Sequence, residues 1–370
     1  MAAAGTTEAP APGRKLAVDV LRGFVMFWII GNDSYSEAFK AISPTGIAGF
    51  LSRQLTHPKW EGFVFYDVIF PTFLFVIGIS ITLSLDKIIA NEGLTGAYKR
   101  IFRRFLLMFF LAFIYDEGFA KIHEEDVLCG VMQRLALCYL FGSLIYCHVK
   151  SPRGLLITFV ILVGSYWALM SFVPIPGRDT VSFLRRENWN DYINMTFNPY
   201  HDSDPEGFLS TIPAVGSCII GLLVGLFLKN KTVPEQKKVW YLLGAGVVMI
   251  VLGYLWSFQF PIIKRVWSPS YVFVAGGCSL LLLAFFQQLL DIWKVRTTLF
   301  TPFLWLGSNA LAVYMAVNLV SFESIAERLV GGPIADAAGR FGPMLITVVS
   351  VALSLWLTKF LYDRKIFIRV

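Results

Sequence analysis

The sequence of 370 residues is poor in charge and in cysteine. Charged residues make up 15% of the chain, whereas soluble domains contain about a quarter, which argues against a water-soluble globular protein. The five cysteines are scattered without CxxC spacing, so neither a disulfide framework nor a zinc site is predicted. No internal repeat is evident, which disfavours an inverted-repeat transporter. Basic residues lie between apolar blocks rather than on one face, so nucleic acid is not an expected partner.

What the chain has in abundance is hydrophobic sequence, at 56% of its residues. It is arranged in blocks of about 20 residues, the length at which an α-helix crosses the hydrocarbon core of a bilayer. We therefore predict an all-α, polytopic membrane helix bundle surrounded by lipid. Residues 1–13 are expected to form a disordered tail, and residues 14–370 a single transmembrane domain. About ten transmembrane helices are predicted, over residues 16–32, 63–84, 101–115, 128–148, 154–173, 209–228, 240–257, 271–290, 303–322 and 342–362.

The distribution of Lys and Arg predicts the orientation of these helices. An even number of spans puts both termini on one side, and most Lys and Arg residues fall on that side. By the positive-inside rule, both termini are then cytoplasmic. The outer side carries most of the acidic residues and the longer loops, 33–62, 174–208 and 323–341. Chemistry on an extracytoplasmic substrate is the natural inference.

His57 and Asp67 lie at the start of the second predicted span, one just outside it and the other about one turn inside. Histidine is suited to proton transfer near neutral pH, so His57 is a candidate catalytic residue; an ordinary interfacial loop residue is the alternative. A carboxylate at the depth of Asp67 is costly without a partner.

Arg134 enters the fourth predicted span from the same side and to a similar depth as Asp67. We therefore predict an Asp67–Arg134 pair that lines an outward-facing cavity. Snorkelling of Arg134 to the outer interface is the alternative. Asn32 ends the first predicted span at the outer face. Its amide is placed to donate a hydrogen bond to a developing oxyanion, although helix capping is equally compatible with its position.

Two further groups of polar residues allow both a structural and a functional interpretation. Asp204 is predicted to cap a helix whose first turn holds Pro205 and Glu206, so the acidic segment 201–207 is not predicted to bind metal, although it suits an amino-bearing ligand. Ser268 is likewise interpreted first as a helix-start residue. The positive-inside bias explains the inner basic group, which would also suit a phosphate-rich cytoplasmic cofactor. This group consists of Lys99, Arg100, Arg103 and Arg104.

Short motifs along almost the whole chain resemble the bacterial relatives of heparan-α-glucosaminide N-acetyltransferase, a family of transmembrane acyltransferases. Each motif is weak alone, but the ordered set is specific. The matching segments are 17–24 (AVDVLRGF), 57–62 (HPKWEG), Asp67 with Phe70 and Pro71, 73–78 (FLFVIG), 130–135 (GVMQRL), 204–207 (DPEG), 209–211 (LST), Trp267 and Ser268 before Tyr271, and 306–310 (LGSNA).

This resemblance implies a multi-pass protein of the bacterial cytoplasmic (inner) membrane. Such a protein takes acetyl-CoA from the cytoplasm and acetylates the amine of an amino sugar or glycan end, typically a terminal glucosamine, on the other side. It implies His57 as base or transient acetyl carrier, Asn32 as oxyanion donor and Asp67 as an orienting residue; direct transfer is our hypothesis. It implies no metal cofactor, and by analogy a homodimer.

The matched motifs also imply binding residues. Glu61 stands where the family often has Asn or a small polar residue, which leaves the acceptor open between an amine and a hydroxyl. The implied acceptor-binding residues are Trp60, Glu61, Arg134, Asp204, Glu206, Trp267 and Ser268. The residues implied to hold the nucleotide end of CoA are Arg22, Lys99, Arg100, Arg103 and Arg104.

Two other functions are compatible with the residues alone. An amino-sugar transporter is the first alternative, because polar residues inside helices also mark a substrate path. A membrane scaffold in cell-envelope assembly is the second, and it predicts that replacing His57 leaves function intact.

Overall fold

A computed structural model describes residues 15–115, 130–197 and 207–367. Within these ranges the chain is helical and forms no β-strand, which confirms the all-α prediction. Among the described residues, six helices are long and apolar enough to cross a membrane, or seven if the bent pair α10–α11 forms one span. Ten spans and cytoplasmic termini therefore stay predictions. The α-helices are α1 (Leu16–Ile42), α2 (Gly46–Gln54), α3 (Ile69–Tyr115), α4 (Val131–His148), α5 (Pro152–Phe172), α6 (Trp189–Phe197), α7 (Thr211–Lys229), α8 (Glu235–Trp256), α9 (Pro269–Gln287), α10 (Thr301–Ser308), α11 (Ala310–Val320), α12 (Phe322–Val330), α13 (Pro333–Ala337) and α14 (Gly342–Asp363).

Shorter turns of helix join these elements. They are η1 (Phe65–Val68), η3 (Gln288–Ile292), η4 (Thr297–Phe300) and η5 (Gly339–Phe341).

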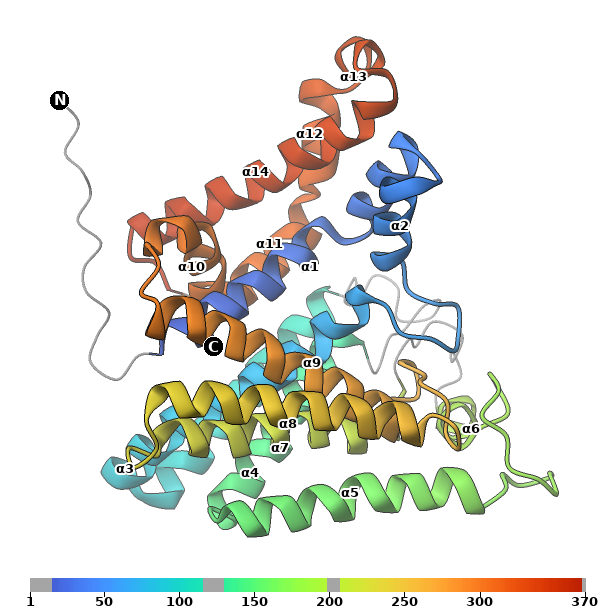
Figure 1. The fold of residues 1–370 in the computed structure, drawn as a ribbon, viewed down its shortest axis with the longest axis vertical. Helices are drawn as coiled ribbons and strands as arrows, with labels where there is room; N and C mark the ends of the chain where they lie inside the picture. The colour runs from blue at the N-terminus through green and yellow to red at the C-terminus, as the bar shows by residue number, and fades with distance from the viewer. Residues whose placement is uncertain (1–14, 116–129, 198–206, 368–370) are drawn as a thin grey trace.

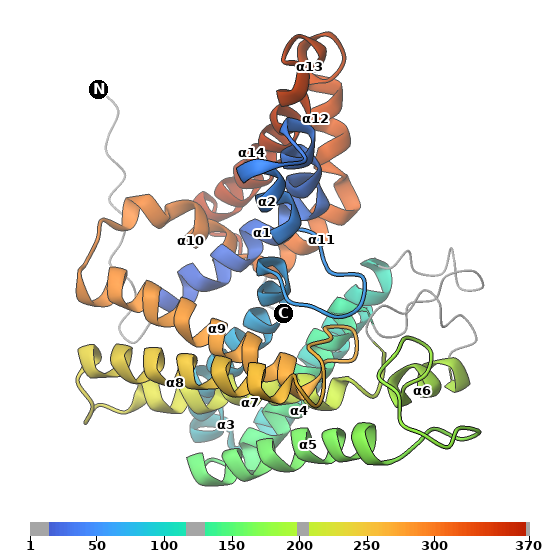
Figure 2. The same cartoon turned by 45° about the vertical axis from the view of Figure 1, so that its right-hand side comes forward.

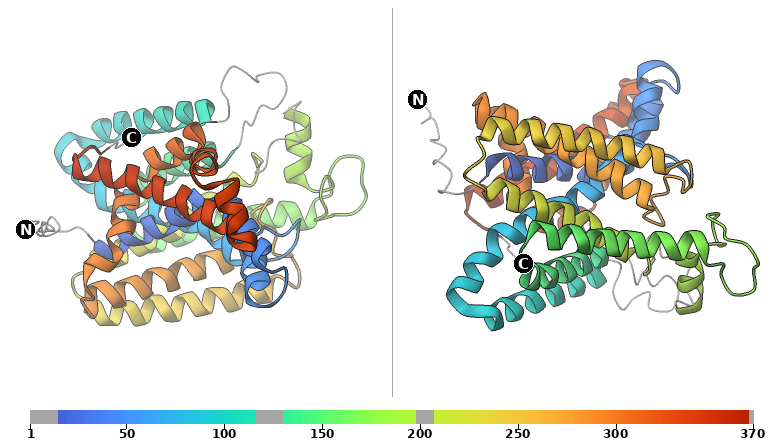
Figure 3. Two further views of the ribbon diagram at one scale, coloured as in Figure 1. Left: turned by 90° about the horizontal axis from the view of Figure 1, so that it is seen from above. Right: turned by 60° about the horizontal axis from the view of Figure 1, so that its bottom comes forward.

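The long helices lie broadly side by side (Figures 1 and 2). The start of α1, the bend of α3 and the start of α8 share one end of the bundle, whereas α2, α6 and α13 lie toward the opposite end (Figure 3). Large apolar side chains are exposed along α5 and α8, among them Ile157, Ile161, Val248 and Leu252. A soluble protein would not leave such continuous faces in water, so lipid is the natural environment of these helices.

The helices depart from the predicted spans in three places. The first span is longer, because α1 continues through Asn32 to Ile42 instead of ending there. The second and third spans join into α3, which bends at Gly93, where φ is 69°. Glycine reaches this left-handed region without steric cost. The ninth span is broken by a bend of 75° between Ser308 and Ala310.

Local sequence explains how α5 and α9 begin. The side chain of Ser151 accepts a hydrogen bond from the amide of Gly154, and Pro152 follows at the first helical position. Ser268 does the same for α9, accepting from the amide of Tyr271 ahead of Pro269. Both starts satisfy an amide that the helix leaves unpaired. The prediction that Ser268 is a helix-start residue is confirmed.

Glycines let two pairs of helices approach closely. A Cβ atom at Gly221 of α7 would overlap the carbonyl oxygen of Phe75 on α3, and one at Gly78 would overlap that of Cys218 on α7. Gly23 of α1 meets Phe303 of α10 in the same way. Small residues at such crossings allow backbone-to-backbone packing, the main source of helix association in lipid.

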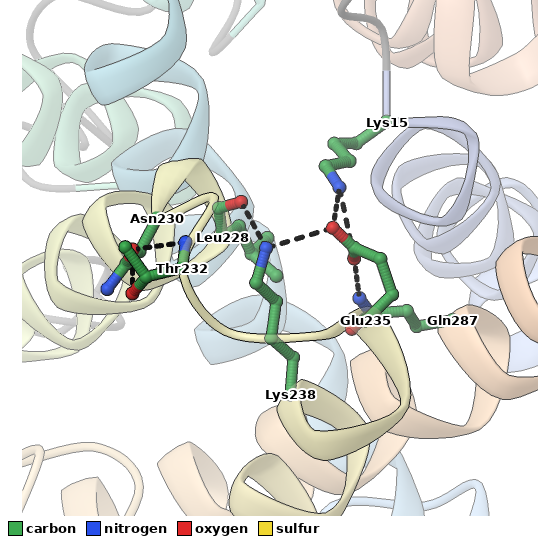
Figure 4. Close-up of polar contacts among 7 residues, drawn as sticks. All are labelled: Lys15, Leu228, Asn230, Thr232, Glu235, Lys238 and Gln287. Atoms are coloured by element: carbon green, nitrogen blue, oxygen red, sulfur yellow. Dashed lines mark hydrogen bonds and ion pairs between the residues drawn. The ribbon is translucent and has the colours of Figure 1, made fainter.

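An ion-pair cluster ties the start of α1 to α8 and α9 (Figure 4). Lys15 Nζ donates to both carboxylate oxygens of Glu235, at 3.1 and 3.2 Å. The buried Lys238 donates to Glu235 Oε1 at 2.9 Å and to the carbonyl of Leu228 at 3.0 Å. Gln287 Nε2 completes the cluster, 3.0 Å from Glu235 Oε2. One carboxylate therefore serves three donors and joins α1, α8 and α9 at this end of the bundle.

Candidate active site

The candidate active site centres on an Asp–His pair. Asp67 lies in η1, directly before α3, and its carboxylate is fully buried, while the His57 side chain is 38% exposed. Asp67 Oδ1 lies 2.6 Å from His57 Nδ1. Asp67 Oδ2 accepts from the amide of Val64 at 3.0 Å, and the Asp67 carbonyl accepts from the Tyr271 hydroxyl at 2.8 Å. The carboxylate is therefore held rigidly, and it holds the imidazole in turn.

This pairing selects the tautomer of a neutral His57. A carboxylate only accepts hydrogen bonds, so Nδ1 carries the proton and Nε2 keeps a lone pair. Lys264 Nζ lies 2.9 Å from Nε2, and the Tyr66 ring packs at 4.9 Å between centroids. An imidazole oriented by a carboxylate, with its second nitrogen directed away from that carboxylate, has the arrangement of a general base.

Two loops, one before α3 and one before α9, are joined to each other at this site. Glu61 and Ile263 form an isolated antiparallel bridge, and the amide of Gly62 donates to the carbonyl of Ile262 at 3.0 Å. The second loop is closed by Ser268, whose Oγ accepts from the amide of Ile263 at 3.1 Å. These bonds fix the two loops that carry His57 and Lys264.

His57 opens into a cavity of about 520 Å³, here called the acidic cavity. Asp33 and Glu37 of α1 and Glu323 of α12 line it together with His57 and Lys264. Two of these carboxylates reach the cavity because α1 continues past Asn32. Ser34 Oγ also donates to Glu323 Oε1 at 2.8 Å, which ties α1 to α12.

A second cavity of about 760 Å³, here called the basic cavity, is lined by all five residues that the resemblance assigns to CoA binding. Glu92 is the one acidic residue among the described residues that line it. Arg22 is fixed there, donating to Ser80 Oγ at 2.8 Å and to the carbonyl of Gly307 at 3.3 Å. Arg104 lies over the Tyr139 ring at 4.5 Å. Guanidinium groups gathered in this way suit phosphate.

The two cavities follow one another along the same four helices. On α3 and α11 the residues that line one cavity and the other are three positions apart, or about 5 Å at a rise of 1.5 Å per residue. The residues that line the two cavities are therefore about one helical turn apart along those two helices. Each of the four helices contributes residues to both linings. For each helix, one residue of the basic cavity and one of the acidic cavity are, in that order, Arg22 and Ile29 on α1, Phe73 and Phe70 on α3, Met132 and Val131 on α4, and Leu311 and Tyr314 on α11.

The predicted Asp67–Arg134 pair is wrong. Both oxygens of Asp67 are engaged by His57 and the amide of Val64. Arg134 is fully buried and does not line the cavity; its Nη2 donates to the carbonyl of Gly207 and to Ser210 Oγ, each at 2.7 Å. A histidine satisfies the Asp67 carboxylate instead.

Other predicted acceptor-binding residues lie around the site rather than in it. Trp267 and Ser268 are fully buried, and Trp267 Nε1 donates to Ser217 Oγ at 3.2 Å. Trp60 Nε1 donates to the carbonyl of Phe183 at 2.9 Å, while Glu61 is exposed beside the loop bridge. None of these four lines the acidic cavity, and their acceptor-binding role stays a prediction.

Asp204 and Glu206 lie outside the described residues, as does most of the segment 201–207. Asn32 lies within α1 rather than at its end, and its role as oxyanion donor stays a prediction. In the described part of the chain, no three His, Cys, Asp or Glu side chains converge in a way that would hold a metal ion.

Sequence reasoning missed Lys264 and the three carboxylates of the acidic cavity. Lys264 is 207 positions from His57, so no spacing rule links them. Asp33 and Glu37 were hidden by the expectation that the first helix ends at Asn32. Helical spacing does carry a signal for them, because residues four apart share a face.

Comparison with known proteins identifies the chain. A sequence model of the family described as heparan-alpha-glucosaminide N-acetyltransferase, catalytic, matches residues 14–257. The chain belongs to this family. The resemblance inferred from the motifs is thereby confirmed, and the matched region contains His57 and Asp67, whereas Lys264 lies beyond it.

Two relatives extend the likeness to most of the chain. The heparan-alpha-glucosaminide N-acetyltransferase of Mus musculus is 24% identical over 378 residues, covering 85% of this chain and 56% of that protein. That of Homo sapiens is 24% identical over 377 residues, covering 85% and 55%. The chain thus spans about half the length of the curated relatives that it matches.

Proposed function

We propose that this protein is a transmembrane acetyltransferase that moves an acetyl group from cytoplasmic acetyl-CoA to the amine of an extracytoplasmic amino sugar or glycan end. The observation that carries the proposal is the Asp67–His57 pair, which opens into the acidic cavity next to the basic cavity on the same helices. A base in one cavity and a phosphate-binding surface in the neighbouring cavity are what acyl transfer across a membrane needs.

The basic cavity suits the donor. Its volume of about 760 Å³ lies within the range of small-molecule sites, and five cationic side chains match the phosphates of the nucleotide end of CoA. The positive-inside rule places these residues on the cytoplasmic side, where acetyl-CoA is the expected donor. The thioester end would then extend along α3 and α11 toward His57.

The acidic cavity suits the acceptor. Asp33, Glu37 and Glu323 surround the approach to His57, and carboxylates attract an ammonium group by charge. An ammonium group must lose a proton before its nitrogen attacks a carbonyl carbon, and the lone pair of His57 Nε2 is the acceptor for that proton once the acceptor has displaced Lys264.

We propose direct transfer as the reaction. His57 Nε2 takes a proton from the acceptor ammonium, and the resulting amine nitrogen attacks the thioester carbonyl carbon. The new C–N bond forms and the C–S bond breaks, so CoA leaves as the thiolate. The amide nitrogen gives up its remaining extra proton to water, and the thiolate takes a proton from the imidazolium, which returns His57 to its neutral form. Asp67 stabilises the imidazolium between these steps.

The proposal is tested with purified protein in detergent, labelled acetyl-CoA and a panel of amino sugars. The wild type is expected to produce acetylated sugar, and the His57→Ala variant to lose at least about 100-fold in kcat. His148→Ala is the matched control, because His148 bonds Tyr98 at the surface and lines neither cavity. Acetylated product from His57→Ala at the wild-type rate would overturn the role of His57.

The transporter alternative has its own readout. In proteoliposomes, net sugar uptake without acetyl-CoA would replace this proposal with transport, whereas acetylated sugar formed from acetyl-CoA on the opposite side supports the proposal. A rapidly turning-over acetyl-histidine on His57 would replace direct transfer with a two-step route.

A further inference from the structure

Lys264 places a cation directly on the reactive nitrogen of the candidate base. Its Nζ lies 2.9 Å from His57 Nε2, at a hydrogen-bonding distance. The loop that carries it is rigid, because the amide of Trp267 donates to the carbonyl of Lys264 at 2.9 Å and the neighbouring Ile263 pairs with Glu61. The two joined loops therefore hold the backbone of Lys264 close to His57.

The direction of this hydrogen bond is determined by chemistry. Asp67 holds the proton on Nδ1 of a neutral imidazole, so Nε2 is an acceptor, and an ammonium group can only donate. Lys264 thus occupies the position that the ammonium of the acceptor must take for its proton to reach Nε2. When the acceptor takes that position, the Lys264 ammonium must move aside, and it stays within a few ångströms of the nitrogen that attacks.

We propose that Lys264 is a catalytic residue, whose ammonium donates a hydrogen bond to the oxyanion that develops on the thioester carbonyl during attack. This inference rests on the proposed acetyl transfer. Once the acceptor has displaced it from Nε2, the Lys264 ammonium stays tethered to the same loop, about 3–5 Å from the amine nitrogen. The carbonyl oxygen is bonded to the carbon that the amine attacks, and so falls within reach of the ammonium.

The surrounding charges fit this role. The three carboxylates of the acidic cavity offset the positive charge of Lys264, so a cationic acceptor still finds a favourable potential. The oxyanion takes no proton from Lys264 in this step; the charge collapses back when the C–S bond breaks. Removing one such donor from an oxyanion site typically lowers kcat by about 100- to 1,000-fold.

Lys264→Gln tests the proposal, with Arg265→Gln as its matched control. Arg265 is the next residue of the same loop and is exposed to solvent, so its replacement removes an equal charge without touching His57. Steady-state kcat and KM for the amino sugar, and binding of acetyl-CoA measured by calorimetry, are compared for both variants and the wild type. We expect kcat to fall at least about 30-fold in Lys264→Gln, with KM for the amino sugar and acetyl-CoA binding little changed. Arg265→Gln is expected to resemble the wild type.

Each outcome separates this inference from the proposed function. If the wild type forms no acetylated sugar, the proposed function fails first. If the wild type is active and Lys264→Gln keeps its kcat, or changes only KM, then Lys264 is not catalytic although the enzyme assignment stands. If the Gln variant does not bind acetyl-CoA, Lys264→Arg and Lys264→Met are compared instead. A higher kcat in Lys264→Arg than in Lys264→Met supports a charged donor. An equal loss of kcat in the Arg and Met variants would overturn the proposal.

Discussion

At the scale of single residues, the site depends on how Asp67 is satisfied. A fully buried carboxylate needs partners, and it finds them in His57 Nδ1 and the amide of Val64. Those bonds leave one ring nitrogen of His57 facing the acidic cavity. His57 therefore stabilises the buried carboxylate of Asp67, and Asp67 in turn determines which nitrogen of His57 carries the proton.

We predict that Asp67→Asn lowers kcat by at least about 100-fold. The Asn amide can donate to Nδ1, which moves the ring proton to Nε2 and removes the base. Acetylation of an amino sugar at saturating substrate measures the effect.

Asp33→Asn is the control for this change, since Asp33 lines the same cavity without contacting His57. It is expected to raise KM for the acceptor and to leave kcat within about threefold of wild type. An Asp67→Asn enzyme as fast as Asp33→Asn would show that the tautomer does not matter.

At the scale of the helices, close crossings determine where both cavities lie. α3 carries residues of each cavity and packs against α7 through Gly78 and Gly221. A side chain at either position would push the two backbones apart. The same holds where Gly23 of α1 meets α10. Because α1 and α3 line both cavities, little movement of these helices is tolerated.

We predict that Gly221→Ala destabilises the protein by about 1–3 kcal/mol, because its methyl group overlaps the carbonyl of Phe75. Gly244 of α8 has open space around it, so Gly244→Ala is the matched control. It is expected to be neutral or to stabilise by up to about 1 kcal/mol through helix propensity. The midpoint of thermal unfolding in detergent compares the two. Equal shifts for both variants would contradict the close packing of α3 against α7.

At the scale of the whole molecule, charge is divided between the two cavities. Five cations line one cavity, and three carboxylates with His57 and Lys264 line the other. The helices run from one to the other without an intervening domain. Donor and acceptor are therefore expected to bind independently, each through its own set of charges.

We predict a clean separation of kinetic effects between the cavities. Arg103→Gln is expected to raise KM for acetyl-CoA about tenfold, by loss of a charge-assisted hydrogen bond, and to spare KM for the amino sugar. Glu323→Gln is expected to do the reverse. Lys87→Gln is the control, since Lys87 is exposed on the same helix as Arg103 but lines neither cavity. Both variants changing both KM values alike would contradict separate sites.

Much of this protein followed from its sequence alone. Apolar blocks of membrane-spanning length predicted the helices, Ser268 was predicted to start a helix, and the basic group around Arg103 was recognised as a phosphate-binding candidate. These features are local, because helix formation, capping and charge density depend on residues a few positions apart.

Only the tertiary structure decided the composition of the site. It paired Asp67 with His57 instead of Arg134, brought Lys264 from 207 positions away to the same imidazole, and extended α1 so that Asp33 and Glu37 reach the acidic cavity. The physical reason is that a buried charge takes whichever partner the packed helices bring within hydrogen-bond distance. Sequence spacing carries no information about distances between helices that meet only after the chain has folded.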